Sequence, residues 1–202
     1  MSKAKIFTDP KGNPTNKVRI PCRFNYMHLF DPDPFYEGQE KYTMTLIISK
    51  DDKETVALVK QAIKSAAEHA QGMRLTLAYD NQPLKDGDIG RPESDAFKNT
   101  FYISAKSNTK PKVKRMEVDR SITNLGPSDI KDGDYGCVIV SINPYAGKQG
   151  GKPGVGCYLN SVLWERSGEP LGGGLSDEDA FEGLDPAEHE SGTVAAPADD
   201  WI

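Results

Sequence analysis

Residues 42–71 read YTMTLIISKDDKETVALVKQAIKSAAEHAQ, and this stretch decides the fold. Its first eight residues, rich in Thr and Ile, predict a β-strand over 42–49. Asp51 with Glu54 three residues on resembles a capping box, and a glycine at 72 supplies a stop. The apolar positions between them share one helix face: Val56, Val59, Ile63, Ala66 and Ala70. We therefore expect a helix over 52–71 directly after the strand.

The rest of the body is predicted as strands between turn signals. Residues 17–30 alternate, with Phe24, Tyr26, His28 and Phe30 expected on one face and the residues between them on the other. Further β-branched or aromatic runs, each flanked by Gly, Pro, Asn or Asp, lie at 99–105, 136–143 and 155–165. Five strands with one inserted helix is the composition of a small β-barrel, so the fold class is mainly β.

Length and composition exclude several classes of protein. The chain has 202 residues, enough for one domain with an appendage. No apolar run approaches the roughly 18 residues of a membrane helix, and no apolar stretch follows the basic N-terminus as a secretory signal would require. Three cysteines without C-x-x-C spacing, Cys22, Cys137 and Cys157, are expected to be buried small hydrophobes in a reducing cytoplasm.

The charge is divided unevenly along the chain. The net charge is −5, yet residues 1–175 hold all 25 Lys and Arg with 21 acids, whereas residues 176–202 hold nine acids and no base. We expect a mildly basic domain over 1–175 and an acidic, disordered tail over 176–202. The tail ends in Asp199, Asp200, Trp201 and Ile202, and a tail needed only for solubility has no use for a Trp.

Enzymatic patterns are weak. His28, His69 and His189 fall on a predicted strand, in the helix and in the tail, so their spacing suggests neither a metal site nor a catalytic pair. The Gly-rich segment 147–154 lacks the ending of a phosphate-binding loop and is better explained as a hairpin loop. We expect no catalytic residues, no metal and no cofactor.

Basic residues interleaved with aromatics give the strongest functional signal. Aromatic rings can stack on bases while cations follow the phosphates, without a requirement for base sequence. The lysine-rich stretch 98–120 follows two adjacent rings and indicates nucleic-acid contact, and further rings and cations lie on the first strand, in the loop after it and near residue 148. The candidate nucleic-acid-binding residues are Arg23, Tyr26, Phe35, Tyr36, Tyr102, Lys106, Lys110, Lys112, Lys114, Arg115, Tyr145, Lys148 and Lys152.

Several of these stretches resemble a family of tailed-phage single-stranded-DNA-binding proteins. The similarity covers nearly all of 15–175, on the order and spacing of 26–30, 41–52, 84–88, 101–111, 118–120 and 156–173. The resemblance implies a five-stranded oligonucleotide/oligosaccharide-binding (OB) barrel with one inserted helix and extra hairpins, and non-catalytic binding of single-stranded DNA in replication, recombination or repair.

The acidic tail with its Trp-Ile tip is separately similar to the tails of bacterial and phage single-strand-binding proteins. That similarity implies recruitment of replication proteins, such as a polymerase, helicase or primase, through residues 199–202. It also implies that the tail competes with DNA for the basic groove. The cell compartment implied is the cytoplasm of an infected bacterial host.

The residues leave alternatives open. An RNA- or duplex-binding protein, a small metal-dependent nuclease and a virion structural protein with an incidental basic face all remain, as do a monomer and a homodimer. Which rings face the nucleic acid depends on strand register, because a slip of one residue exchanges the two faces of a strand.

Overall fold

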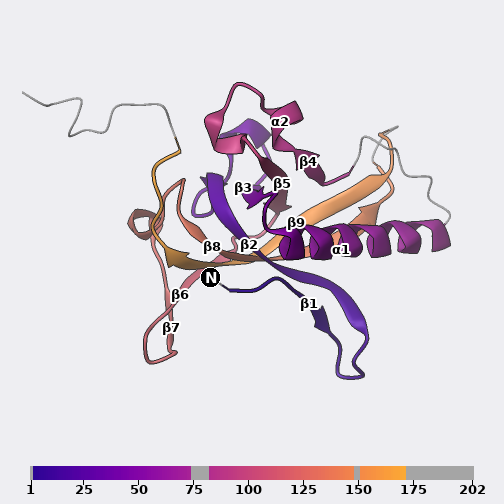
Figure 1. Ribbon diagram of the computed structural model, residues 1–202, viewed down its shortest axis with the longest axis horizontal. Helices are drawn as coiled ribbons and strands as arrows, with labels where there is room; N and C mark the ends of the chain where they lie inside the picture. Colours follow the sequence, from indigo (N-terminus) through magenta and orange to yellow (C-terminus); the bar gives the residue numbers. More distant parts are fainter. Residues whose placement is uncertain (1, 74–81, 148–150, 172–202) are drawn as a thin grey trace, which may run out of the picture. The chain divides into compact units, whose positions relative to one another are not determined.

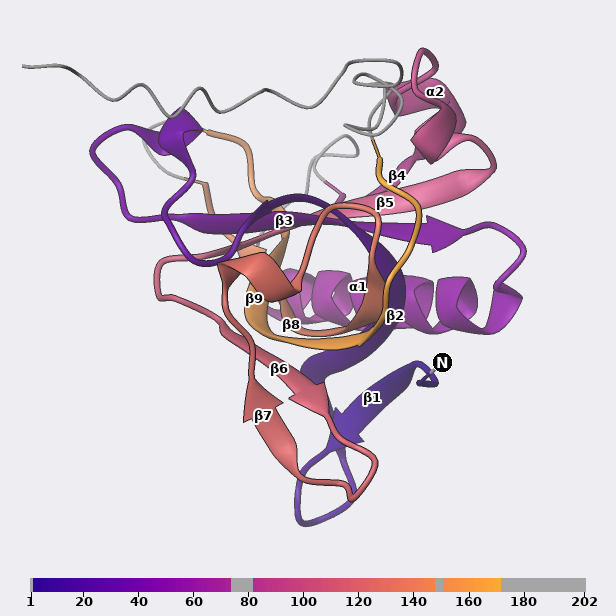
Figure 2. The ribbon, with the colours of Figure 1, turned by 90° about the vertical axis from the view of Figure 1, so that its left-hand side faces the viewer.

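The fold is built on a closed ring of five strands, seen end-on in Figure 2. The computed structural model describes residues 2–73, 82–147 and 151–171. Around the ring, each strand pairs antiparallel with the next, except for one parallel pairing between β5 and β9. In ring order the strands are β2 (Pro14–His28), β3 (Tyr42–Ser49), β5 (Thr100–Ser107), β9 (Gly154–Arg166) and β8 (Tyr135–Tyr145), which pairs again with β2. A closed five-stranded barrel of this order is an OB fold, which confirms the predicted fold class.

Smaller elements extend the ring (Figure 1). Strand β1 (Lys5–Thr8) pairs with β2, and β4 (Leu84–Asp86) pairs with β5. Strand β6 (Lys112–Met116) runs parallel to β9 and forms a hairpin with β7 (Ile122–Asn124). The helices are α1 (Lys53–Gly72), the short α2 (Gly87–Gly90) and the 3-10 turns η1 (Pro34–Tyr36), η2 (Asp95–Phe97) and η3 (Pro127–Asp129).

The helix α1 closes one end of the barrel and lies behind the ring in Figure 2. Its predicted apolar stripe is buried, and Val59 is fully inaccessible in the same core as Val18 and Val138. The predicted start is displaced by one residue. Asp52 rather than Asp51 is the N-cap, because its carboxylate accepts the Thr55 N–H at 3.0 Å. No helix in the described ranges is both long and apolar enough to cross a bilayer.

All three cysteines are buried and free, as the sequence predicts. Burial raises the pKa of the Cys157 thiol to about 12 and that of Cys22 well above its ordinary value. Neither thiol forms an appreciable amount of thiolate near neutral pH, so neither is a nucleophile.

The predicted alternation along residues 17–30 is wrong after Asn25. Phe24 is fully buried in the core, whereas Tyr26 is 48% exposed and has a left-handed backbone with φ of +49°. The pairing of β2 with β3 shifts register between Asn25 and His28, so a bulge turns the last residues of the strand. Bulges carry no strict sequence signature, and a period of two does not reveal them.

Residues up to Leu171 form one compact unit. The acidic tail over 176–202, including the tip at 199–202, lies outside the described residues and stays a prediction.

Candidate nucleic-acid interface

A groove of about 790 Å³ lies along the outer face of β5 where the barrel closes onto β9. On β5, Ile103 and Ala105 point into the core, so Ser104 and Lys106 point outward. The groove also takes in Lys41, at the end of the loop 29–41 between β2 and β3, and Tyr145, the last residue of β8. We call it the β5–β9 groove. Its lining residues are Lys41, Gln82, Pro83, Lys85, Ser104, Lys106, Ser107, Asn108, Thr109, Tyr145 and residues 155–160.

The loop 29–41 presents a ring between two cations. The ammonium groups of Lys106 and Lys41 lie 4.6 and 5.1 Å from the centre of the Tyr36 ring, and Lys106 donates a hydrogen bond to the Tyr36 hydroxyl. Asp33 fixes this arrangement, because its carboxylate accepts the Phe35 N–H at 3.0 Å and the Thr43 hydroxyl at 2.7 Å. Phe35 is 84% exposed and meets Tyr36 edge-on.

The charge of Asp33 is stabilised where it stands. Partial burial alone would raise the pKa of this carboxyl. The hydrogen bonds from Thr43 and Phe35, with the nearby His28 and Lys106, outweigh that effect and hold the pKa below its ordinary value. The anchor of the loop is therefore ionised at neutral pH.

Two further rings stand at the β8–β9 end of the groove. Tyr145 and Tyr158 are 36% and 42% exposed. Tyr158 lies over Gly156, where a β-carbon would come within 3.1 Å of the ring, so a bare backbone lets the ring lie flat. Lys152 is exposed in the same connection, and Lys148 lies outside the described residues.

A third aromatic group lies two strands from the groove. Ser104 pairs with Thr45 and Thr45 with Asn25, so this row leads from the groove to the residue before Tyr26. The Tyr26 ring is stacked on Phe97 at 6.5 Å between centroids, and the guanidinium carbon of Arg91 lies 5.4 Å from the Tyr26 ring centre. This places an exposed ring and a cation side by side.

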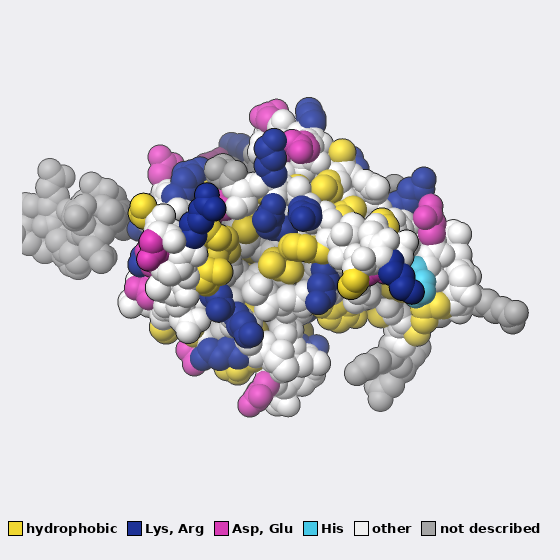
Figure 3. All heavy atoms as spheres, turned by 90° about the horizontal axis from the view of Figure 1, so that it is seen from below, with side chains coloured by type: hydrophobic (Ala, Val, Ile, Leu, Met, Phe, Trp, Pro, Cys, Tyr) yellow, Lys and Arg dark blue, Asp and Glu magenta, His cyan; other side chains and the backbone are white. Residues whose placement is uncertain are grey.

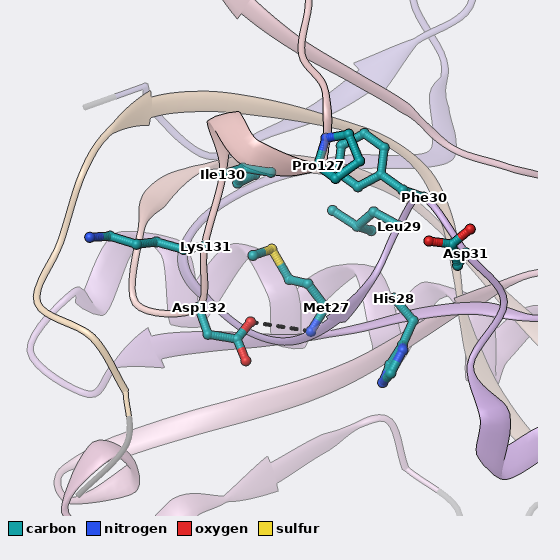
Figure 4. A pocket seen from close by; sticks show the side chains of 9 residues that line it. All are labelled: Met27, His28, Leu29, Phe30, Asp31, Pro127, Ile130, Lys131 and Asp132. Carbon is teal, nitrogen blue, oxygen red and sulfur yellow. Dashed lines mark hydrogen bonds between the residues drawn. The ribbon is translucent and has the colours of Figure 1, made fainter. Parts of the chain in front are cut away.

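The strained backbone of Tyr26 is held by two side chains, because its N–H is shared between the amide oxygen of Asn25 at 2.9 Å and the carboxylate of Asp132. Asp132 accepts the N–H of Tyr26 at 3.0 Å and that of Met27 at 3.2 Å. Figure 4 shows the Met27 bond at a separate pocket of about 340 Å³ between the end of β2 and η3. A non-glycine residue with positive φ needs such support, and strain of this kind concentrates at functional sites.

Two predicted residues are engaged in contacts within the protein. Tyr102 was expected to expose its ring, but the ring is only 7% exposed beneath α2 and η2. Gly90 allows this cover, because a β-carbon there would lie 2.6 Å from the Tyr102 hydroxyl. Arg23 donates to the carbonyls of Gly133 at 3.0 Å and Glu169 at 2.6 Å, so it fastens the segment after β9 to the barrel.

The predicted lysine cluster is divided among different surfaces. Lys106 lines the groove, and Lys110 stands 5.8 Å from the Phe30 ring centre. Lys112 and Lys114 alternate with the buried Val113 on β6. Arg115 pairs with Glu117 at 2.9 Å, away from those two lysines.

Sequence reasoning missed several residues of this surface. Lys41, Lys85 and Tyr158 line the groove, and Arg91 stands beside Tyr26. Tyr158 had a usable signal, because it alternates with the buried Cys157 and Leu159 along a strand. Arg91 had none, since only the path of the chain through α2 brings it to β2. Across the described ranges, no group of His, Cys, Asp and Glu could hold a metal ion.

An OB barrel with a cationic, ring-lined groove between its loops defines a class, the OB proteins that bind single strands. Within it, the chain belongs to the family described as Enterobacter phage Enc34, ssDNA-binding protein, whose model matches residues 15–193. The resemblance seen in the sequence is thereby confirmed. Members of this family are binding proteins and not enzymes, which also confirms the expectation that the protein is non-catalytic.

Solved structures show the same fold. The single-stranded DNA-binding protein from bacteriophage Enc34 in complex with ssDNA is 24% identical, with a TM-score of 0.66 over 78% of this chain and 90% of that one. Bacteriophage T7 gp2.5, a single-stranded DNA-binding protein, is 14% identical, with a TM-score of 0.52 over 79% and 97%. No curated protein sequence matches the chain significantly.

Proposed function

We propose that this protein binds and protects single-stranded DNA in the β5–β9 groove, largely without regard to sequence. The observation that carries the proposal is the juxtaposition of Lys106, Lys41 and Tyr36 with Tyr145 and Tyr158 along one groove. OB proteins bind oligonucleotides on this part of the barrel and its loops. The Enc34 relative, which shares the fold, is described in complex with ssDNA.

The groove is suited to single strands of any sequence. Each stacked base is worth about 1–3 kcal/mol, and every base has a face that can stack. The lysines supply a contact to phosphates that is independent of sequence. Duplex DNA keeps its bases stacked on each other, so rings such as Tyr158 have nothing to stack on.

The setting we propose is phage DNA replication, recombination or repair in the cytoplasm of an infected bacterium, with the protein as a monomer or homodimer. The acidic tail would recruit a polymerase, helicase or primase through Asp199, Asp200, Trp201 and Ile202. Nine negative charges on a flexible tether would also compete with DNA for the lysines of the groove.

Fluorescence titration of oligo-dT at several salt concentrations tests these proposals. We expect Tyr158→Ala to weaken binding by about 1–3 kcal/mol and Lys106→Ala to reduce the salt slope by about 0.7. Lys64→Ala, on the exposed side of α1, is the control. Replacing the nine tail acids by their amides should strengthen binding.

If the groove variants bind oligo-dT like the control, DNA does not bind in the β5–β9 groove. If neutralising the tail has no effect on binding, the tail does not compete with DNA. Competition with an RNA oligomer and a DNA duplex of equal length separates the alternatives. Tighter binding of either would overturn the preference for single-stranded DNA.

A further inference from the structure

A second basic surface lies on the outer side of the strands β1, β2, β8, β9 and β6, away from the β5–β9 groove. Figure 3 shows this underside, where dark-blue Lys and Arg side chains gather around apolar ones with few acids between them. Five of the cations on these strands define it: Lys5, Lys17, Arg19, Lys112 and Lys114. We call this surface the second basic face.

Strand register places these cations in rows. Lys5 pairs with Arg19, Arg19 with Ile139, Ile139 with Ser161 and Ser161 with Lys112. Directly paired residues share one face of a sheet. The neighbouring row of Ile20, Val138, Val162 and Val113 is buried in the core, so the row that contains Lys5 and Arg19 points outward.

The described residues do not neutralise the cations of this face. Within the described ranges, none of the five forms an ion pair. Arg19 is held in place by a bond from its Nε to the Lys3 carbonyl at 2.9 Å. Glu165, farther along β9, instead accepts the N–H of Ser2 at 3.0 Å. A row of like charges at strand spacing favours an external polyanion.

The spacing suits a nucleic-acid backbone. Arg19 and Lys112 are three strand steps apart, roughly 14 Å at about 4.8 Å per step. That distance spans roughly four phosphates of a stacked strand. The ammonium of Lys5 lies 5.6 Å from the Phe7 ring centre, so the row also ends beside an aromatic side chain.

One row joins this face to the groove. Lys106 in the groove pairs with Tyr158, Tyr158 with Ser141, and Ser141 with Lys17. A DNA single strand that passes Tyr158 therefore meets Lys17 after it crosses the β-strands β9 and β8. We propose that the second basic face binds the stretch of single-stranded DNA that leaves the groove past Tyr158, holding it by its phosphates. The proposal rests on the DNA-binding function proposed above but uses different residues.

Oligo-dT of two lengths, about 8 and about 30 nucleotides, tests the proposal, because one OB fold occupies roughly 4–16 nucleotides. The face variant carries Lys5→Glu, Arg19→Glu and Lys112→Glu in the full chain. The control carries Lys53→Glu, Lys60→Glu and Lys64→Glu on exposed positions of α1, with the same change in net charge. The face variant should bind the long oligomer about tenfold more weakly than the control, with a salt slope lower by about two. Binding of the short oligomer should match the control.

Equal binding of the long oligomer by both variants would overturn the proposal, as would an equal loss at both lengths. A fluorescent poly-Glu peptide that binds the wild-type face as tightly as an oligomer of equal charge would overturn it in favour of an acidic protein segment. Thermal unfolding shows whether the face variant is folded. If the Glu substitutions disrupt the fold, a variant with Gln at the same three positions takes its place. The groove variant Tyr158→Ala tests the proposed function separately, because a loss of DNA binding in the groove weakens the binding of both the short and the long oligomer.

Discussion

At the scale of single residues, Tyr26 adopts an unfavourable backbone conformation that leaves its ring exposed. Its left-handed backbone would ordinarily select glycine, asparagine or aspartate, yet a tyrosine is kept with its ring next to Arg91. Asp132 compensates by accepting two consecutive N–H groups. A carboxylate in one turn thus positions a ring on a distant strand.

Substitution of Asp132 by Ala should therefore affect both stability and binding. Two N–H groups lose a charged acceptor, and we expect a loss of about 1–3 kcal/mol in the free energy of unfolding, measured by urea titration. Oligo-dT affinity should fall as well, because the ring is no longer held. Asp31→Ala, an exposed position in the loop after β2, is the matched control. If the two variants are equally stable, Asp132 does not support the bulge.

At the scale of elements, the loop 29–41 is the part of the groove with a definable anchor. Asp33 caps η1 and binds Thr43 of β3, which holds Tyr36 beside Lys106. Its pKa in the folded protein lies below the ordinary 3.8. The stabilisation from its charge is therefore present above the unfolded pKa and lost as the pH falls through the lower folded value.

The variant Asp33→Ala should lose about 1 kcal/mol of stability near neutral pH, which is typical of a lost cap. Near pH 2 the difference from wild type should shrink, because the wild-type carboxyl is then protonated too. Urea unfolding at the two pH values measures this difference. A gap that stays constant with pH would show that the charge of Asp33 contributes nothing.

The elements also show how much of the molecule could be predicted. The five ring strands and α1 follow from period and turn signals, because each has a buried face of its own. The short strands β4 and β7 do not, since three residues carry no period. The distribution of the lysines in 98–120 was not predictable for a related reason. The chain turns between β5 and β6, so neighbours in sequence lie on different surfaces.

At the scale of the whole molecule, the net charge of −5 does not reveal how the basic residues are distributed over the barrel. Two groups of cations on the described body lie in the β5–β9 groove and on the second basic face, and Tyr158 belongs to the row between them. Charge counts along the sequence predicted a basic body with an acidic tail. Only the strand register shows that the basic residues follow a path around the barrel.

The most direct test of the central claim is photo-crosslinking of the full chain to oligo-dT that carries 5-iododeoxyuridine, with the adducts mapped by mass spectrometry. If DNA lies in the β5–β9 groove, adducts should form at Tyr36, Tyr145 or Tyr158, the rings beside the groove lysines. Adducts that avoid these three rings and fall on α1 would contradict the claim.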